Sequence, residues 1–129
     1  MKTANDPRHL HRIKAFKGLF AQTFIDQELL KDNDLSIATW ENLTQIDQIV
    51  TKCAPEWPLN QINKVDLSVL RLSIYELLFK RDVPTKVILD EAVEIAKRYG
   101  GPNSGSFVNG ALAHALELTD RKEDEPKFN

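Results

Sequence analysis

The residues of this chain most suited to chemistry are cations near its N-terminus. Residues 1–24 carry a formal charge of +4, from five lysines and arginines against one aspartate, while the remaining residues sum to −6. A basic segment on an acidic body is suited to local contact with an anionic polymer such as a nucleic acid. A solvated helix face explains the same charges equally well. The basic side chains are Lys2, Arg8, Arg12, Lys14 and Lys17, with His9 and His11 among them.

Other chemical equipment is sparse. The sequence has no phosphate-binding loop with its lysine, no dinucleotide fingerprint, no H-E-x-x-H helix and no nucleophile elbow. His9 and His11 are two residues apart, on different faces of a helix, so we expect no metal site. Asp90 and Glu91 have no histidine, cysteine or lysine in recognisable relation to them, and the single Cys53 suits a core position. We therefore expect neither a cofactor nor enzymatic activity.

The bulk properties indicate one cytoplasmic domain. Of 129 residues, 42% are hydrophobic and 28% charged, which allows one sizeable core. No apolar run approaches the ~20 residues of a membrane-spanning helix, and the N-terminus lacks the apolar segment of a secretory signal. We place a single helical domain at residues 1–119, with a basic arm at about 1–24. We expect residues 120–129 to be a disordered, charged tail.

The first helix must position the basic residues. Asp6 and Pro7 suit its N-cap and its first turn. Apolar residues at spacings of three and four predict a buried face of Leu10, Ile13, Phe16, Phe20 and Phe24. The residues that then point outward or flank the apolar face are Arg8, His11, Arg12, Lys14 and Lys17. Burying the aromatic residues therefore presents the cations.

A second helix is expected from about Ser36 to Cys53, because apolar residues continue near helical spacing over this range. Pro55 and Pro58 end it. Trp57 stands between these prolines. Such a tryptophan more often fixes a connection onto the core than binds a ligand.

Residues 66–99 form the centre of the predicted fold. The first part is apolar on more than one face, as in a helix buried by neighbours on several sides. A further helix begins after Pro84 and ends at Gly100. Polar residues in these helices need partners, and we single out Arg71, Glu76 and Glu91. Glu76 should find its partner on a neighbouring element, because Arg71 lies five residues earlier on the same helix.

The last helix resumes near Phe107, after a glycine-rich turn. Its small residues allow close packing. Its first amides could hold a phosphate, although a C-cap, a turn and an N-cap in series explain the glycines better. With no β-period alternation of useful length, the pattern predicts an all-α fold, a compact helical bundle of about five helices.

Four ordered motifs stand in the C-terminal half of the chain. They are Leu70-Arg71 with Tyr75-Glu76-Leu77, Val83-Pro84, Glu91-Ala92 with Glu94 and Ala96-Lys97, and Phe107 to Gly110. In this order they resemble the L-R-x-x-x-Y-E-L, V-P, E-A-x-E-x-A-K and F-V-N-G elements of the bacterial NusB family of transcription antitermination factors. The basic first helix is similar to the arginine-rich start of that family.

The resemblance implies a NusB-like helical fold without enzymatic activity, and a set of partners. It implies binding of boxA-type single-stranded RNA together with the ribosomal protein NusE, within an antitermination complex of RNA polymerase. The RNA-binding residues that it implies are Arg8, His9, His11, Arg12, Lys14, Lys17, Phe20 and Phe107. The residues implied for the NusE partner are Asp66, Glu76 and Asn103.

Two departures from the family pattern leave alternatives open. Histidines replace arginines in the arm, which lowers its charge near neutral pH. The stretch before Asp66 is short, as though one helix were missing, and dimerisation could compensate for it. The chain could therefore be a homodimeric protein-contact module that has lost RNA binding. It could also be related to the NusB-like domain of ribosomal RNA cytosine methyltransferases.

Overall fold

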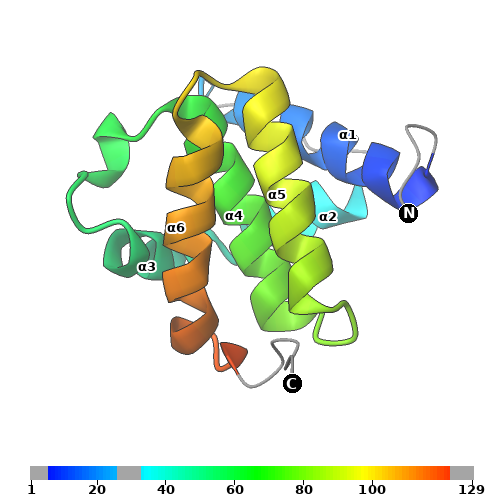
Figure 1. Ribbon diagram of the computed structural model, residues 1–129. Coiled ribbons are helices and arrows are strands. Elements are labelled where there is room, and N and C mark those ends of the chain that lie inside the picture. Colours follow the sequence, from blue (N-terminus) through cyan, green and yellow to red (C-terminus); the bar gives the residue numbers. More distant parts are fainter. Residues whose placement is uncertain (1–5, 26–32, 123–129) are drawn as a thin grey trace.

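The computed structural model describes residues 6–25 and 33–122, and these ranges contain helices and no strand (Figure 1). The elements within them are α1 (Pro7–Gln22), α2 (Asp34–Glu41), α3 (Leu43–Cys53), the 3-10 helix η1 (Leu59–Gln61), α4 (Lys64–Phe79), α5 (Thr85–Tyr99) and α6 (Ser104–Leu118). The all-α class is confirmed, with six α-helices in these ranges in place of about five. No described helix is both long and apolar enough to cross a membrane.

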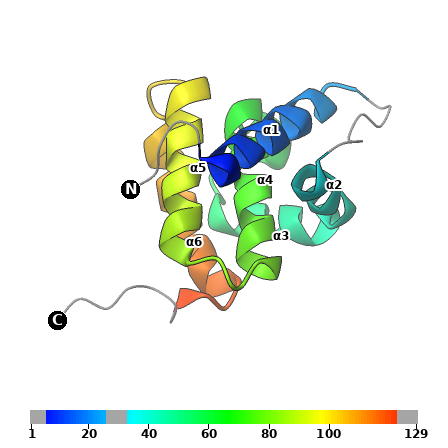
Figure 2. The same cartoon turned by 90° about the vertical axis from the view of Figure 1, so that its right-hand side faces the viewer.

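Helix α4 is the centre of the bundle. Every residue from Asp66 to Leu77 is buried, because α1, α2, α3, α5 and α6 all pack against it (Figures 1 and 2). Asn63 begins the helix, and its side-chain oxygen accepts a hydrogen bond from the Val65 amide at 2.8 Å. The predicted central helix is confirmed, and its polar side chains must be satisfied inside the molecule.

Helices α5 and α6 lie side by side along α4 (Figure 1). The first of them begins after Pro84 and ends at Gly100, as predicted. A Cβ atom at Gly100 would collide with the Ser104 hydroxyl and lie 2.7 Å from the Ala96 carbonyl oxygen. The same hydroxyl accepts a hydrogen bond from the Gly101 amide at 3.0 Å. Glycine therefore permits the tight turn that sets α6 against α5.

The region between α1 and α4 differs most from expectation. Asn33 caps α2 by accepting a hydrogen bond from the Ser36 amide at 2.9 Å. The chain turns at Asn42, so the helix expected from Ser36 to Cys53 is two helices. The stretch that was expected to lack one helix because it is short holds α2, α3 and η1. Trp57 is 51% exposed, so the prediction that it fixes this connection onto the core is wrong.

Helix α1 buries a different set of residues from its apolar stripe. Ile13 and Phe16 are buried as predicted, and Phe20 is half-buried. Leu10 and Phe24 are 48% and 63% exposed, contrary to the prediction. Polar residues of α1 take up part of the buried face instead, and they form the site described below.

The C-terminal end of the described chain is anchored to the bundle. Arg121 is 1% exposed and donates hydrogen bonds to the carbonyl oxygens of Leu77 at 2.9 Å and Val83 at 2.7 Å. In return, Arg81 donates to the Thr119 carbonyl oxygen at 3.1 Å. The expectation of a disordered tail is therefore wrong for residues 120–122, and residues 123–129 lie outside the described residues.

Candidate functional site

Two residues implied for RNA binding belong instead to a buried network between α1, α4 and α5. The Arg12 guanidinium donates to Glu76 through Nε at 3.0 Å and Nη2 at 2.8 Å, and to Glu91 through Nη1 at 3.2 Å. His9 Nδ1 lies 2.9 Å from Glu91 Oε2. Arg12 is 7% and His9 4% exposed. Their burial leaves these two side chains, which the resemblance implied for RNA binding, without an exposed surface, and they hold the start of α1 against the bundle.

The charges of this network compensate one another. Burial by itself lowers the pKa of the Arg12 guanidinium, but hydrogen bonds and charges from Glu76 and Glu91 outweigh burial and raise it. Arg12 thus offsets one of the two carboxylate charges, and His9 Nδ1 lies within hydrogen-bond distance of Glu91. Arg12 is the partner that Glu76 was predicted to find on a neighbouring element. Because Glu76 is 3% exposed, it has no surface for the direct partner contact that the resemblance implied.

The exposed cations at the start of α1 are also paired. Arg8 Nη2 lies 3.3 Å from Asp6 Oδ2, and His11 Nε2 lies 2.6 Å from Asp34 Oδ1 on α2. Burial raises the pKa of the Asp34 carboxyl, but the hydrogen bond and charge of His11, together with backbone hydrogen bonds, outweigh burial, and the pKa is lowered. Lys2, another residue of the predicted arm, lies outside the described residues.

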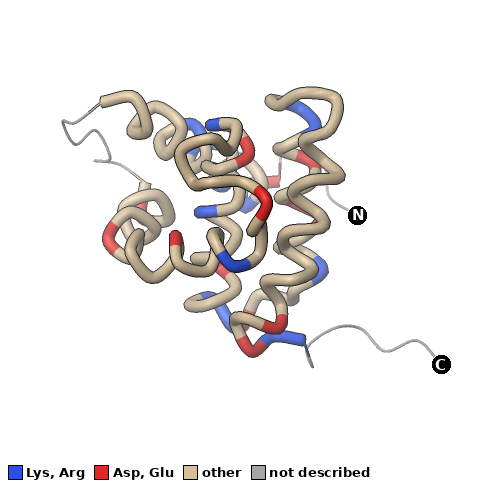
Figure 3. Tube along the Cα trace, turned by 90° about the vertical axis from the view of Figure 1, so that its left-hand side faces the viewer, with Lys and Arg blue, Asp and Glu red and all other residues tan. Residues whose placement is uncertain are grey.

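Lys14 and Lys17 are the cations of α1 that no carboxylate of the described residues neutralises. Both are exposed. Charged positions of both signs are interspersed along the trace on the side drawn in Figure 3. The positive charge that α1 can offer to an anionic ligand therefore lies in the middle of the helix, and not at its start.

An aromatic group lies beside Lys17. Tyr99, the last residue of α5, packs on Phe16 with ring centroids 5.2 Å apart. Lys17 Nζ lies 5.5 Å and the Arg98 guanidinium 5.1 Å from the Tyr99 ring centroid. The Phe20 ring also contacts Phe16, with ring centroids 6.1 Å apart. No sequence prediction singled out Tyr99, although the two cations just before it in the sequence were an available signal.

A pocket of about 440 Å³ collects three of the implied site residues at the starts of α4 and α6. Asp66 and Asn103, implied for the partner, line it with Phe107, implied for RNA, and with the exposed Trp57. Asp66 is 7% exposed, and its Oδ1 has no hydrogen-bond partner among the described residues. Burial raises the pKa of Asp66, although a hydrogen bond with Ser104 opposes the shift. Such a pocket can accept N–H donors beside an aromatic surface.

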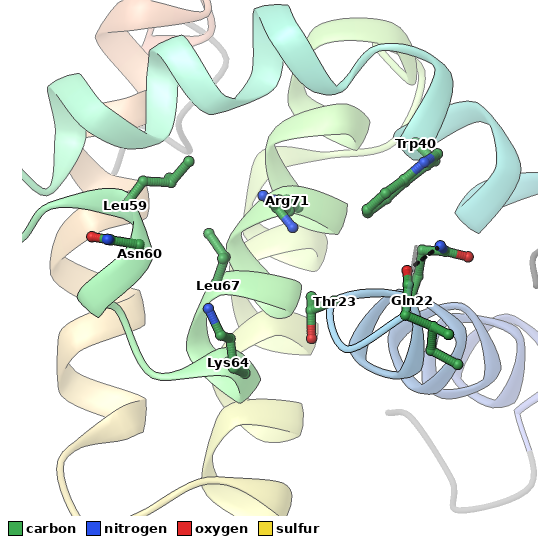
Figure 4. Close-up of a pocket in the computed structure, with 9 residues that line it drawn as sticks. Gln22, Thr23, Trp40, Leu59, Asn60, Lys64, Leu67 and Arg71 are labelled. Atoms are coloured by element: carbon green, nitrogen blue, oxygen red, sulfur yellow. Dashed lines mark hydrogen bonds between the residues drawn. The ribbon is translucent and has the colours of Figure 1, made fainter. Parts of the chain in front are cut away.

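A larger pocket of about 710 Å³ lies between the end of α1, α2, η1 and α4 (Figure 4). In Figure 4 the residues of α4 lie between Leu59 on one side and Trp40 on the other. Arg71 donates to Asp47 through Nε and Nη2, each at 2.9 Å, and its guanidinium lies 5.8 Å from the Trp40 ring centroid. Arg71 is therefore satisfied by a neighbouring helix and needs no ligand to explain it.

One group of side chains has the spacing of metal ligands. The potential ligand atoms of His9, Glu91 and Glu94 lie within 4.8 Å of one another. The Arg12 guanidinium is bonded to the same Glu91, and its positive charge opposes that of a metal ion at this position. The arrangement is therefore better suited to an ion-pair network than to a metal.

Together these features define a small all-helical domain whose pockets and unpaired cations are suited to binding. Comparison with known proteins shows the family to which the chain belongs. The profile of the NusB family matches residues 10–117, and the chain belongs to this family.

The relatives agree with this assignment. Proteins named transcription antitermination protein NusB include one from Thermotoga maritima, 51% identical over 87 residues, or 67% of this chain and 58% of the relative. The one from Agathobacter rectalis is 42% identical over 122 residues, with 79% and 93% covered. The chain thus spans about 58% of the length of the Thermotoga relatives. A solved structure of T. maritima NusB matches with a TM-score of 0.79 at 38% identity, over 96% of this chain and 98% of that one, which confirms the expected NusB-like fold.

Proposed function

We propose that this protein is a transcription antitermination factor that binds boxA-type single-stranded RNA together with the ribosomal protein NusE. Besides family membership, one observation carries the proposal, namely the pocket in which Asp66, Asn103 and Phe107 meet Trp57. Single-stranded RNA is read by stacking of bases on aromatic side chains and by hydrogen bonds to base edges. The aromatic side chains of this pocket, its amide and its unsatisfied carboxylate oxygen supply both kinds of contact. The protein would act by binding and not by catalysis.

The electrostatic part of RNA binding is proposed for Lys14 and Lys17. Both are exposed, and no carboxylate of the described residues pairs with them, so each can exchange counterions for RNA phosphates. Arg12 and His9 contribute indirectly, because they fix the orientation of α1 through Glu91. Phe20 offers its half-buried ring as a further stacking surface on the same helix.

The NusE contact is proposed at the rim of the same pocket. The unsatisfied oxygen of Asp66 can accept a hydrogen bond from a cationic or N–H donor of the partner, and Asn103 is exposed next to it. RNA and protein would then share one surface, which explains why the two would bind together. Association with the RNA polymerase antitermination complex, in the cytoplasm, follows from this role.

The test is binding of a fluorescently labelled boxA RNA and of a scrambled RNA, with and without NusE, at several salt concentrations. Lys14→Ala/Lys17→Ala should reduce the slope of log K against log salt by about 1.4, because each lost contact to single-stranded RNA removes about 0.7. Phe107→Ala should weaken boxA binding by ~1–3 kcal/mol, the value of one stacked base. The control is Lys52→Ala/Lys80→Ala, which removes the same charge from α3 and the end of α4.

The pairing of basic side chains of α1 with carboxylates favours a second candidate function. Arg8, His9, His11 and Arg12 each pair with a carboxylate, which supports a module that acts through protein contacts, as a homodimer or with NusE, without reading RNA. In that case NusE would still associate, while boxA and scrambled RNA would bind equally weakly in every variant. That result would overturn the RNA-binding proposal.

A further inference from the structure

We propose that the last turn of α5 extends the RNA-binding surface of α1, with Lys97 and Arg98 contacting RNA phosphates. This inference rests on the proposed RNA binding and adds a second helix to the surface. In the sequence, Lys97 and Arg98 stand far from the basic arm. The structure brings Arg98 next to Lys17 of α1 and Lys97 next to the first turn of α6.

The end of α5 carries positive charge that is available to a ligand. Arg8 and Arg12 are neutralised by carboxylates, and the histidines of α1 also face acidic partners. In contrast, no carboxylate of the described residues pairs with Lys97 or Arg98, as is the case for Lys14 and Lys17. Both α5 residues are exposed. A phosphate that approaches α1 therefore finds its next unpaired cations on α5.

Two helices bring positive charge to one aromatic ring. Lys17 Nζ from α1 and the Arg98 guanidinium from α5 lie 5.5 and 5.1 Å from the centroid of Tyr99. These distances limit the separation of the two charges to about one Debye length at ordinary ionic strength, ~10 Å, so both charges contribute to the electrostatic potential at this part of the surface. Tyr99 is held in place by its contact with Phe16, which makes the pair a fixed feature of the surface.

The positive charge continues from α5 onto the first turn of α6. A Cβ atom at Gly105 would lie 2.8 Å from Lys97 Cγ and 3.0 Å from Lys97 Cε, so the aliphatic stem of Lys97 lies directly on this turn. Lys97 and Arg98 also line a shallow pocket with Asn109, one turn further along the same face of α6. The unpaired cations thus lead from Lys17 through Arg98 and Lys97 to the face of α6 that packs on α5.

The surface has a defined boundary. Glu94 and Asp90 lie one and two turns before Arg98 on α5, and both line a shallow pocket with it. Glu94 Oε2 lies 3.8 Å from His9 Nδ1, on the side of the buried network. Asp90 is paired with Lys86, whose Nζ lies 3.0 Å from Asp90 Oδ2, so the negative charge that confines the proposed phosphate contacts to the C-terminal turn of α5 is that of Glu94.

The experiment measures the salt dependence of RNA binding by the full chain carrying Lys97→Ala/Arg98→Ala. Loss of two phosphate contacts should lower the slope of log K against log salt by about 1.4, which corresponds to about 25-fold weaker binding near 0.1 M salt. The conservative Lys97→Arg/Arg98→Lys variant keeps both charges and should retain the slope. Lys52→Ala/Lys80→Ala serves as the matched control, and thermal unfolding of each variant checks the fold.

The outcomes separate this inference from the function on which it rests. If Lys97→Ala/Arg98→Ala matches the control while Lys14→Ala/Lys17→Ala lowers the slope, α5 does not contact RNA and the inference fails alone. If the wild-type chain binds neither boxA nor scrambled RNA, with or without NusE, both proposals fail. A loss of slope on α5 that the charge-conserving variant does not show supports the inference.

Discussion

Replacing Arg12 with alanine removes the cation that compensates two buried carboxylates. Glu76 and Glu91 are 3% and 4% exposed, and the guanidinium reaches both of them. Removal of one partner from a buried ion pair typically costs 3–5 kcal/mol, because the remaining charge stays buried without compensation. For a domain of this size we expect the unfolding midpoint to fall by roughly 10–20 °C. Arg8→Ala is the matched control, with a side chain 84% exposed and an expected change within ~0.5 kcal/mol.

Urea and thermal unfolding of Arg12→Ala at pH 7 measure this loss. Adding Glu76→Gln to Arg12→Ala should recover part of the stability, with a coupling of ~1–3 kcal/mol, because the amide has no charge to compensate. If Arg12→Ala is no less stable than Arg8→Ala, or if the two substitutions are simply additive, the buried network does not hold α1 in the way described.

Three further predictions concern single sites. Burial raises the pKa of Asp66, so the contribution of this carboxyl to folding stability is present at low pH and is lost as the pH rises through its folded-state pKa. Asp66→Asn should therefore stabilise the fold by about 1 kcal/mol at pH 7 and by less at pH 5, as measured in urea titrations. Gly100→Ala should destabilise the folded protein by ~1–3 kcal/mol, because the new methyl group collides with the Ser104 hydroxyl. Gly110→Ala has open space around it in α6 and should stabilise the protein by ~0.5–1 kcal/mol. Equal melting temperatures for the two variants would contradict the turn geometry. Burial raises the pKa of the Cys53 thiol to about 11, so it should resist thiol reagents at pH 8 until the chain is denatured, and rapid labelling of the native protein would refute its burial.

The sequence was most informative where one physical signal acted alone. The run of apolar residues around α4 predicted a helix buried on several sides, and Gly100 ended α5 as expected. The demand that a buried carboxylate be paired also placed the partner of Glu76 on another element, which is Arg12 of α1. These predictions succeeded because burial and chain termination are local consequences of residue type.

The sequence-based predictions failed where the packing of helices against one another decided which residues are buried and where a helix ends. The buried face of α1 was predicted from apolar residues alone, which left out Arg12 and His9, whereas acidic residues on α4 and α5 provide them with a buried position. The break at Asn42 was missed because apolar residues continue at helical spacing on both sides of it. The nearness of Tyr99 to Lys17 depends on how α1 crosses the bundle, which no residue spacing within either helix encodes.

The two arginines that link the end of α6 to the turn between α4 and α5 also have a consequence for hydrogen exchange. The last turn of a helix ordinarily opens at little cost, and its amides exchange by local fraying. Here the Arg121 amide donates to the Leu116 carbonyl oxygen at 2.7 Å, while its guanidinium is bonded to the carbonyl oxygens of Leu77 and Val83. Opening this turn requires breaking bonds to two other segments of the bundle. Its amide protons should therefore exchange with the slow set of α4 and not with the fast set of a free helix end.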